Sequence, residues 1–396
     1  MSGHVGNLST YQQETLNKFR QNVENILTQE ELEDDYYMLR WLRARDFDLQ
    51  KTEQMLRKHC RFRKEWKIDR VLAEDSIPEI WKKYFPGNYV GYNKDKGPLY
   101  LFCTGRFDLK GIYHSLRPEE LTKYSLSIAE EGTKLCQEQS QKHGKRIEGV
   151  TIIQDMSGFT VSNFYKPAVV HFAKVLGMFE DNYPEFMKDV FVVNASRIFF
   201  IVYAIVKPFL SPKTKEKIRI LGSNYQQVLL KHLDAESLPK IYGGNKVDDD
   251  GDPQCSAIVG HGGEIPTSYY RSSNNKVNNR SEEDYSTVTI ARGDTLKLQF
   301  DINIPGTLMK WEFKTENHNI GFGVVKVIEN EDGTIENYEV IPIARRSCQS
   351  ILEEGNYYCE DAGTYILCFD NSFSWLTGKS LHYAIDILPP DEAITD

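Results

Sequence analysis

The run from residue 198 to residue 221 joins an apolar segment directly to a basic cluster. Ile198–Val206 carries no charged side chain, and Lys207–Arg219 then supplies lysines and an arginine. Basic side chains bind phosphate oxygens, whereas an apolar face can contact acyl chains. Nine residues rise only about 13 Å as a helix, far short of the roughly 20 residues that a membrane span needs. The segment is therefore either a buried helix or a surface that meets lipid beside a phosphate-binding rim.

The usual catalytic motifs do not occur in this sequence. It has no phosphate loop, dinucleotide-binding glycine pattern, zinc-protease motif, paired Cys-x-x-Cys or hydrolase elbow. Asp155 ends a predicted strand but has no neighbouring nucleophile, so a structural turn is favoured. His59 falls on the apolar stripe of a predicted helix and is expected to be a packed core histidine. We expect no enzyme activity and no cofactor.

A metal site is also not expected. Asp248–Asp252 resembles a calcium loop, but its glycine register places Lys246 at the first ligand position and Ala257 at the last. Neither side chain ligates calcium. The acidic run is therefore better interpreted as part of a polar connection.

Composition restricts the class of protein. The chain has 396 residues, which suits two or three domains, and a formal net charge of −9. This charge argues against broad nucleic-acid binding, so any contact with anionic lipid must come from local basic patches. The N-terminus lacks the features of a signal peptide, and the seven cysteines are odd in number and lie partly in apolar runs. These features favour a cytoplasmic protein with reduced thiols.

The first third of the chain is predicted to be helical. Ser9 and Gln12 can form a capping box, a second helix is expected over Asp34–Arg45, and Asp48 is a candidate N-cap for a third. From about residue 85, strands alternate with helices of 10–20 residues, and Asn93–Gly97 is a hairpin turn signal. This order predicts an α/β domain with a mixed, largely parallel sheet.

The remainder is predicted to be a linker and an all-β domain. Asn245–Pro253 and Arg271–Arg280 are rich in Asp, Asn, Ser and Gly, which is typical of connecting segments. Short alternating runs between turn signals then favour a β-sandwich, a module that usually serves interactions. The expected divisions are a helical subdomain at 1–75, an α/β domain at 76–245, a linker at 246–274 and a sandwich at 275–390.

Short motifs in order along the chain resemble the CRAL-TRIO lipid-transfer superfamily. They are Asp34–Asp48, Asn182–Glu185, Val193–Ala195, Lys207–Ser211 and the Leu-Pro-x-x-Tyr-Gly-Gly run at 238–244. The last third resembles a GOLD domain through Trp311–Phe313, Ile320–Gly323 and 363–375. Together they resemble the GOLD-carrying, Sec-fourteen-like subgroup. This resemblance implies one lipid or isoprenoid in a closed apolar pocket, exchanged at membranes without covalent chemistry.

The resemblance also implies a phosphoinositide headgroup site. The matching positions are Arg45, Glu185, Thr214 and Lys217. A lysine and a threonine hydroxyl can bind phosphate oxygens, and a carboxylate can accept hydrogen bonds from inositol hydroxyls. The alternatives are local: Arg45 can pair with Asp46 or Asp48, and Glu185 suits the start of a helix.

The implied hydrophobic pocket includes Tyr89, Tyr100, Val150 and Ile152. Relatives that transfer phosphatidylcholine carry hydroxyls where this chain has Val150 and Ile152. In a closed site, each missing hydroxyl would leave the phosphate without one hydrogen bond, at a cost of roughly 1–3 kcal/mol in binding free energy. A neutral isoprenoid such as squalene or a tocopherol therefore becomes more plausible as the second ligand beside phosphatidylinositol.

Lipid exchange requires a movable apolar lid. Moving an 18-carbon chain into water would cost about 13 kcal/mol, at ~0.8 kcal/mol per methylene. The apolar run is the expected lid, with Lys207-Pro208 and Ser211-Pro212 as hinges. The expected lid residues are Phe199, Phe200, Val202, Tyr203, Ile205 and Val206.

Two other functions remain open. The first is a lipid-sensing adaptor whose GOLD domain recruits a membrane or Golgi protein. The second is a weak nucleotide hydrolase, which the missing phosphate loop disfavours. In the favoured interpretation the partners are the ligand, transiently a membrane of the ER or Golgi, and a protein bound by the GOLD domain, without nucleic acid.

Overall fold

The computed structural model describes residues 2–72, 77–271, 284–329, 334–349, 352–375 and 377–391. The chain forms two compact units. Unit 1 contains Met1–Ser196 and Ile205–Ser273, and unit 2 contains Arg197–Ala204 and Asn274–Asp396. Grouping Arg197–Ala204 with the C-terminal part differs from the expected domain division, which kept this segment inside 76–245.

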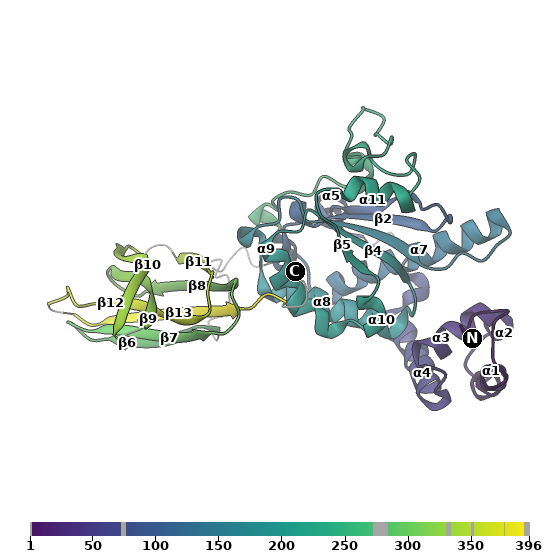
Figure 1. Cartoon of the computed structure of the whole chain (residues 1–396), viewed down its shortest axis with the longest axis horizontal. Helices are drawn as coiled ribbons and strands as arrows, with labels where there is room; N and C mark the ends of the chain where they lie inside the picture. Colours follow the sequence, from purple (N-terminus) through teal and green to yellow (C-terminus); the bar gives the residue numbers. More distant parts are fainter. Residues whose placement is uncertain are drawn as a thin grey trace. The chain divides into compact units, whose positions relative to one another are not determined.

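Unit 1 begins with the predicted helical subdomain, labelled in Figure 1. Ser9 and Gln12 form the capping box, and Asp34 and Asp48 cap the next helices through their side chains. The helices share an apolar core that includes Leu16, Phe19, Leu39 and Trp41. Their bounds are α1 Thr10–Val23, α2 Gln29–Glu33, α3 Asp35–Ala44, α4 Leu49–Trp66 and η1 Ile68–Arg70.

A five-stranded mixed sheet follows, in the order β1-β2-β3-β4-β5. The first two strands form the predicted antiparallel hairpin, and the remaining pairs are parallel. The predicted α/β arrangement is therefore confirmed. The strands are β1 Gly87–Tyr92, β2 Pro98–Cys103, β3 Val150–Asp155, β4 Met187–Val193 and β5 Ile218–Ile220.

The two sheet faces have different partners. One face packs Leu99, Leu101 and Ile153 against Leu229 of α11 and Val259 of α12. The other face meets α7, from which Cys136 and Ile128 reach the sheet. The helices of this domain are α5 Glu79–Tyr84, η2 Thr104–Arg106, α6 Leu109–Ser115, α7 Pro118–His143, η3 Val161–Asn163, α8 Lys166–Asn182, α11 Tyr225–His232, η5 Lys240–Tyr242 and α12 Ser256–Val259.

The opening apolar-to-basic run forms three short helices in succession. Pro208 lies inside the second helix and Pro212 opens the third, so the helical path is broken at both predicted hinges. The helices are α9 Arg197–Val206, η4 Lys207–Phe209 and α10 Pro212–Lys215. None of the helices in the described ranges has the length and apolarity that a bilayer span requires.

The expected linker contains more structure than its composition suggests. Cys255, Val259 and Ile265 are buried, and Arg271 donates to the carbonyl oxygen of His114. A short helix, η6 Thr267–Tyr269, lies in the same stretch. Residues 246–271 therefore belong to unit 1, because scattered apolar side chains fix them there. The last residues of the expected linker, 272–274, lie outside the described residues.

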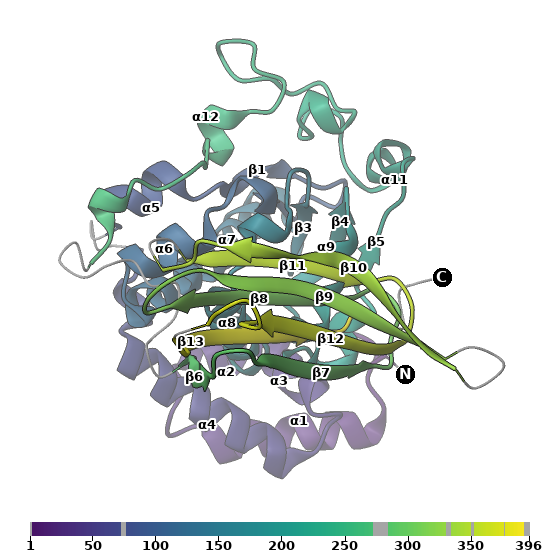
Figure 2. The ribbon, with the colours of Figure 1, turned by 90° about the vertical axis from the view of Figure 1, so that its left-hand side faces the viewer.

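The C-terminal part of unit 2 is the predicted antiparallel sandwich. Its two sheets have the orders β10-β9-β12-β7 and β11-β8-β13-β6, and the long strands are seen in Figure 2. Phe313, Phe322 and Phe369 lie at the centre of its core. The strands are β6 Ser286–Ile290, β7 Thr295–Ile302, β8 Thr307–Thr315, β9 Ile320–Glu329, β10 Ile335–Arg346, β11 Glu353–Cys359, β12 Gly363–Asp370 and β13 Lys379–Leu388.

Candidate functional site

The predicted headgroup residues do not all gather in one place. Glu185 receives a two-pronged hydrogen bond from Arg43, with Nε to Oε1 at 2.8 Å and Nη2 to Oε2 at 2.5 Å. Arg43 is buried near the C-terminus of α3. Arg45, the predicted arginine, is the C-cap of this helix, and its Nη2 lies 3.6 Å from Asp181 instead. Sequence reasoning therefore missed Arg43 as the partner of Glu185.

Lys217 and Glu185 influence each other electrostatically. Burial alone would raise the pKa of Glu185, but the Arg43 guanidinium, together with His4 and Lys217, holds this pKa below its ordinary value. Burial lowers the pKa of Lys217, and Glu185 partly offsets that effect. Lys217 donates from Nζ to the carbonyl oxygen of Met187 at 2.6 Å. A cation and a carboxylate thus lie near the starts of the parallel strands β4 and β5.

Thr214 lies one helical turn before Lys217. Its side chain is buried, and its Oγ1 accepts a hydrogen bond from Ser211 Oγ at 3.0 Å. The Thr214 carbonyl oxygen accepts from the Lys217 backbone N–H. The proline-opened α10 therefore fixes Thr214 and Lys217 relative to each other. Lys213, one residue earlier, donates to the Arg43 carbonyl oxygen at 2.8 Å and thus ties α10 to α3.

The four predicted pocket residues share one sheet face. Tyr89 pairs with Tyr100 across the hairpin, and Tyr100 pairs with Ile152 on the next strand. Val150 lies two residues before Ile152 and so points to the same side. The two tyrosine rings have centroids 5.0 Å apart, and all four residues belong to one apolar cluster.

The two tyrosine hydroxyls differ in their partners. Tyr89 donates to the Ile128 carbonyl oxygen of α7 at 2.7 Å. A Cβ at Gly132 would meet Tyr89 Oη at 2.2 Å, so glycine lets α7 approach the strand. The Tyr100 hydroxyl is buried and has no hydrogen-bond partner among the described residues. Burial raises the pKa of Tyr100 well above its ordinary value.

The predicted lid helix α9 is apolar around its whole circumference. Ile198, Phe199, Ile201 and Tyr203 are buried, and the Phe199 and Tyr203 rings stack at 5.8 Å. The other lid residues, Phe200, Val202, Ile205 and Val206, are only partly buried. Within unit 2, Arg197 at the start of α9 forms an ion pair with Glu360 at 2.5 Å.

Asp155 has the structural role that the sequence favours. Its carboxylate accepts hydrogen bonds from Tyr242 Oη at 2.7 Å, Asn194 Nδ2 at 2.8 Å and the Ser157 backbone N–H at 2.8 Å. Burial, followed by the charges of Cys103 and Asp155, raises the pKa of Tyr242 far above its ordinary value. The motifs around Asn194 and Tyr242 are therefore joined through one buried carboxylate.

Three family matches follow the chain in order. Residues 15–58 match the CRAL/TRIO N-terminal domain, residues 82–244 match the CRAL/TRIO domain, and residues 328–387 match a GOLD domain described as Golgi-dynamics membrane-trafficking. These matches agree with the helical, α/β and sandwich parts of the fold.

Similar proteins cover the chain to different extents. Protein ctg-1 of Caenorhabditis elegans is 28% identical over 96% of this chain and 97% of its own length. Protein real-time of Aedes aegypti is 30% identical over 82% of this chain, and the chain spans only 50% of that relative. The crystal structure of Sfh5 superimposes with a TM-score of 0.48 and 18% identity, covering 64% of this chain and 94% of that one.

Proposed function

Because the chain belongs to the CRAL-TRIO family of lipid-binding and transfer proteins and carries a GOLD domain, we propose that it carries one hydrophobic ligand between membranes. The ligand is phosphatidylinositol or an isoprenoid such as squalene or a tocopherol. It occupies an apolar pocket that α9 opens and closes. The protein acts from the cytoplasm and associates only transiently with ER or Golgi membranes.

The observation that carries this proposal is the buried Tyr100 hydroxyl on an otherwise apolar sheet face. A buried hydroxyl without a partner costs about 1–3 kcal/mol. A ligand that is mostly apolar but carries a single polar group would recover this cost at Tyr100 while its chain lies against the partly buried Ile152. Few buried polar groups on a large apolar wall are typical of lipid and cofactor pockets.

In this proposal, Glu185, Thr214 and Lys217 bind the phosphoinositide headgroup, and Arg43 positions the Glu185 carboxylate. The pair at Arg43 leaves Glu185 ionised, and the neighbouring Lys217 and the Thr214 hydroxyl are suited to phosphate oxygens. Arg45 lies beside Asp181 and would reach such a headgroup only after leaving that partner.

Mass spectrometry of lipid extracted from the purified protein tests the proposal. The expected result is one lipid class at near-stoichiometric amount, together with transfer of that lipid between vesicles. Tyr100→Phe is expected to lower retention of a ligand with a polar group and to leave retention of a pure hydrocarbon unchanged. A protein that copurifies without lipid and does not extract any from vesicles would contradict the proposal.

The lid role of α9 has its own test. Phe200 and Val202 are partly buried, so Phe200→Asp or Val202→Asp should still fold. We expect either charge to abolish transfer, because a carboxylate on the apolar face opposes its insertion among acyl chains. Ile241→Asp is the matched control, since Ile241 is an exposed apolar residue of η5. Unchanged transfer by a folded Phe200→Asp protein would rule out the lid.

A lipid-sensing adaptor is the second candidate, and β10 favours it. This strand lies at the edge of its sheet and exposes Ile335, Tyr338 and Ile343. An exposed apolar edge is suited to pairing with another chain. Deleting residues 275–396 separates the two functions: a transfer protein keeps its transfer activity, whereas an adaptor loses its membrane localisation.

A further inference from the structure

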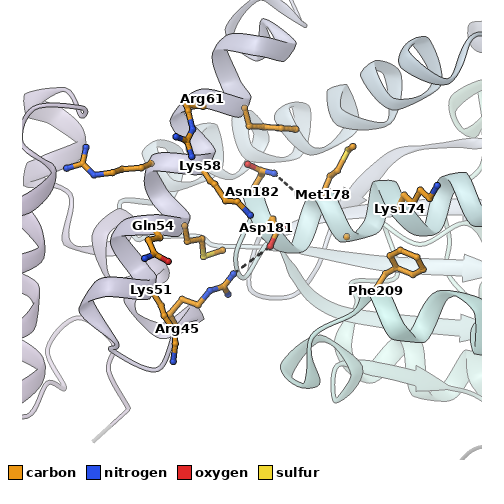
Figure 3. A pocket seen from close by; sticks show the side chains of 14 residues that line it. Arg45, Lys51, Gln54, Lys58, Arg61, Lys174, Met178, Asp181, Asn182 and Phe209 are labelled. Carbon is orange, nitrogen blue, oxygen red and sulfur yellow. Dashed lines mark hydrogen bonds and ion pairs between the residues drawn. The ribbon is translucent and has the colours of Figure 1, made fainter.

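A basic groove of about 880 Å³ lies between α4 and α8, within unit 1 (Figure 3). The basic residues that line it are Arg45, Lys51, Arg57, Lys58, Arg61 and Lys174. Asp181 is the acidic residue in its lining. The groove is thus strongly positive in a chain whose formal net charge is −9.

Half of these cations are already paired. Arg45 faces Asp181 at 3.6 Å, Lys51 lies 2.9 Å from Asp48, and Arg57 lies 2.9 Å from Glu53. Among the residues that the structure describes, no ion pair neutralises the side chains of the other three. These residues are Lys58, Arg61 and Lys174, and all three are exposed. The uncompensated charge of the groove is therefore concentrated at them.

The floor of the groove is apolar. Met55 and Phe62 of α4 face Met178 of α8, and Phe209 of η4 closes one side. A Cβ at Gly177 would lie 3.5 Å from the Phe209 ring, at ordinary van der Waals distance, so α8 packs closely against η4 here. Phe209 is the last residue of η4, which directly follows α9, so the groove includes the segment after the proposed lid.

We propose that this groove docks the protein on an anionic lipid bilayer. From Lys51 to Arg61 the cations extend for about 15 Å along α4, at 1.5 Å per residue. That length exceeds what one phosphate ion can contact but suits several headgroups. Exposed cations above apolar side chains are typical of surfaces that bind the membrane interface. The inference rests on the proposed transfer function and assigns the surface that faces the membrane.

The consequence is a link between docking and ligand exchange. Headgroups in the groove would contact Phe209, which lies at the first proline hinge after α9. The lid would then be released at an anionic membrane and stay closed in water. This arrangement would protect the ligand during transit.

Vesicle cosedimentation tests the groove. The probe is vesicles of phosphatidylcholine with 20% phosphatidylserine, compared with phosphatidylcholine alone. Each basic residue near such a surface contributes about fivefold in affinity, so we expect Lys58→Glu/Arg61→Glu/Lys174→Glu to weaken binding to the anionic vesicles at least about 100-fold. The matched control, Lys18→Glu/Lys142→Glu/Lys231→Glu, carries the same charge change on other exposed lysines and should weaken it only slightly.

Three results would overturn the proposal: no preference of the wild-type protein for anionic vesicles, equal losses in both triple variants, or saturable binding of inorganic phosphate that vesicles do not enhance. If the groove triple variant does not fold, Lys58→Gln/Lys174→Gln replaces it, with an expected loss of about 25-fold. Mass spectrometry of copurified lipid keeps the two proposals distinct. A groove variant should retain its lipid, whereas a wild-type protein without lipid contradicts the transfer function itself.

Discussion

Arg43 fixes a carboxylate that lies 142 positions further along the sequence. Glu185 has a left-handed backbone, with φ of 62°, which is uncommon for a residue with a side chain. The two hydrogen bonds from Arg43 compensate for that conformation. A third, from Arg43 Nη1 to the Gly3 carbonyl oxygen at 3.2 Å, ties in the N-terminal segment. One guanidinium therefore joins three distant parts of unit 1.

We predict different costs for removing the two neighbouring arginines. Arg43→Ala should destabilise unit 1 by about 3 kcal/mol, because the partly buried carboxylate of Glu185 loses both hydrogen bonds from its paired guanidinium. Arg45→Ala should cost less than about 1 kcal/mol, since its pair is long and Asp181 is mostly exposed. Urea unfolding measures both values. Equal losses for the two variants would contradict the assignment of Arg43.

The sequence could not distinguish Arg43 from Arg45. On a helix, two residues separated by two positions point about 200° apart, so only one of them can face Glu185. Which one does so depends on how α3 docks on the α/β domain, a long-range property absent from the local pattern. Glu185, Thr214 and Lys217 are proposed from motif matches, whereas the sequence around Arg43 contains no signal that this arginine is buried.

At the scale of elements, His59 links α4 to α8. Its Nδ1 lies 3.2 Å from Asn182 Oδ1, and Asn182 Nδ2 donates to the Met178 carbonyl oxygen. The amide orientation therefore places the proton on Nδ1 of a neutral His59. Burial, with the charge of Arg63, lowers the pKa of His59 to about 4.

This pKa gives a pH dependence with a defined sign. The folded state keeps His59 neutral, whereas the unfolded chain takes up a proton near pH 6.5. The contribution of His59 to the free energy of unfolding is therefore fully present above that pH. As pH falls from about 6.5 toward 4, we expect unit 1 to lose about 3 kcal/mol from this group. Urea midpoints between pH 7 and pH 4 measure the loss. His59→Gln should flatten the dependence, and an unchanged slope in that variant would disprove the role of His59.

Elements with local signals were predictable and those without were not. The caps predicted at Ser9 and Asp48 are confirmed, and the helix predicted over Asp34–Arg45 begins at Asp35, with Asp34 as its cap. β11 has the sequence Glu-Glu-Gly-Asn-Tyr-Tyr-Cys, which is largely polar in its first half, and was not predicted. It lies at a sheet edge, where backbone pairing with β8 stabilises the strand. Such long-range pairing cannot be read from the composition of the segment.

At the scale of the whole molecule, the two units carry separate apolar cores. Phe313 belongs to the sandwich core, and Leu101 belongs to the α/β core. We predict that Phe313→Ala lowers the stability of the sandwich by about 3–5 kcal/mol. It should leave the lipid content unchanged, because the proposed pocket residues belong to unit 1. Calorimetry and lipid mass spectrometry measure the two effects, and loss of lipid from Phe313→Ala would contradict separate roles.

Leu101→Ala is the reciprocal variant. Leu101 is fully buried in the central sheet, so we expect a loss of about 2–5 kcal/mol in unit 1 together with reduced lipid content. The sandwich transition should stay where it is in the wild-type protein. A shift of both transitions would show that the units unfold together.

The bond between Asp155 and Tyr242 also bears on how the chain is made. The two residues are 87 positions apart, so the carboxylate leaves the ribosome well before its partner. At 5–20 residues per second, that interval is about 4–17 s. During this time Asp155 Oδ2 lacks the Tyr242 hydroxyl, although Ser157 and Asn194 are already synthesised and can donate to Oδ1. The Tyr-Gly-Gly motif thus supplies a late hydrogen bond of the α/β domain. A chain truncated before residue 242 would lack this bond and would be exposed to chaperones and proteases.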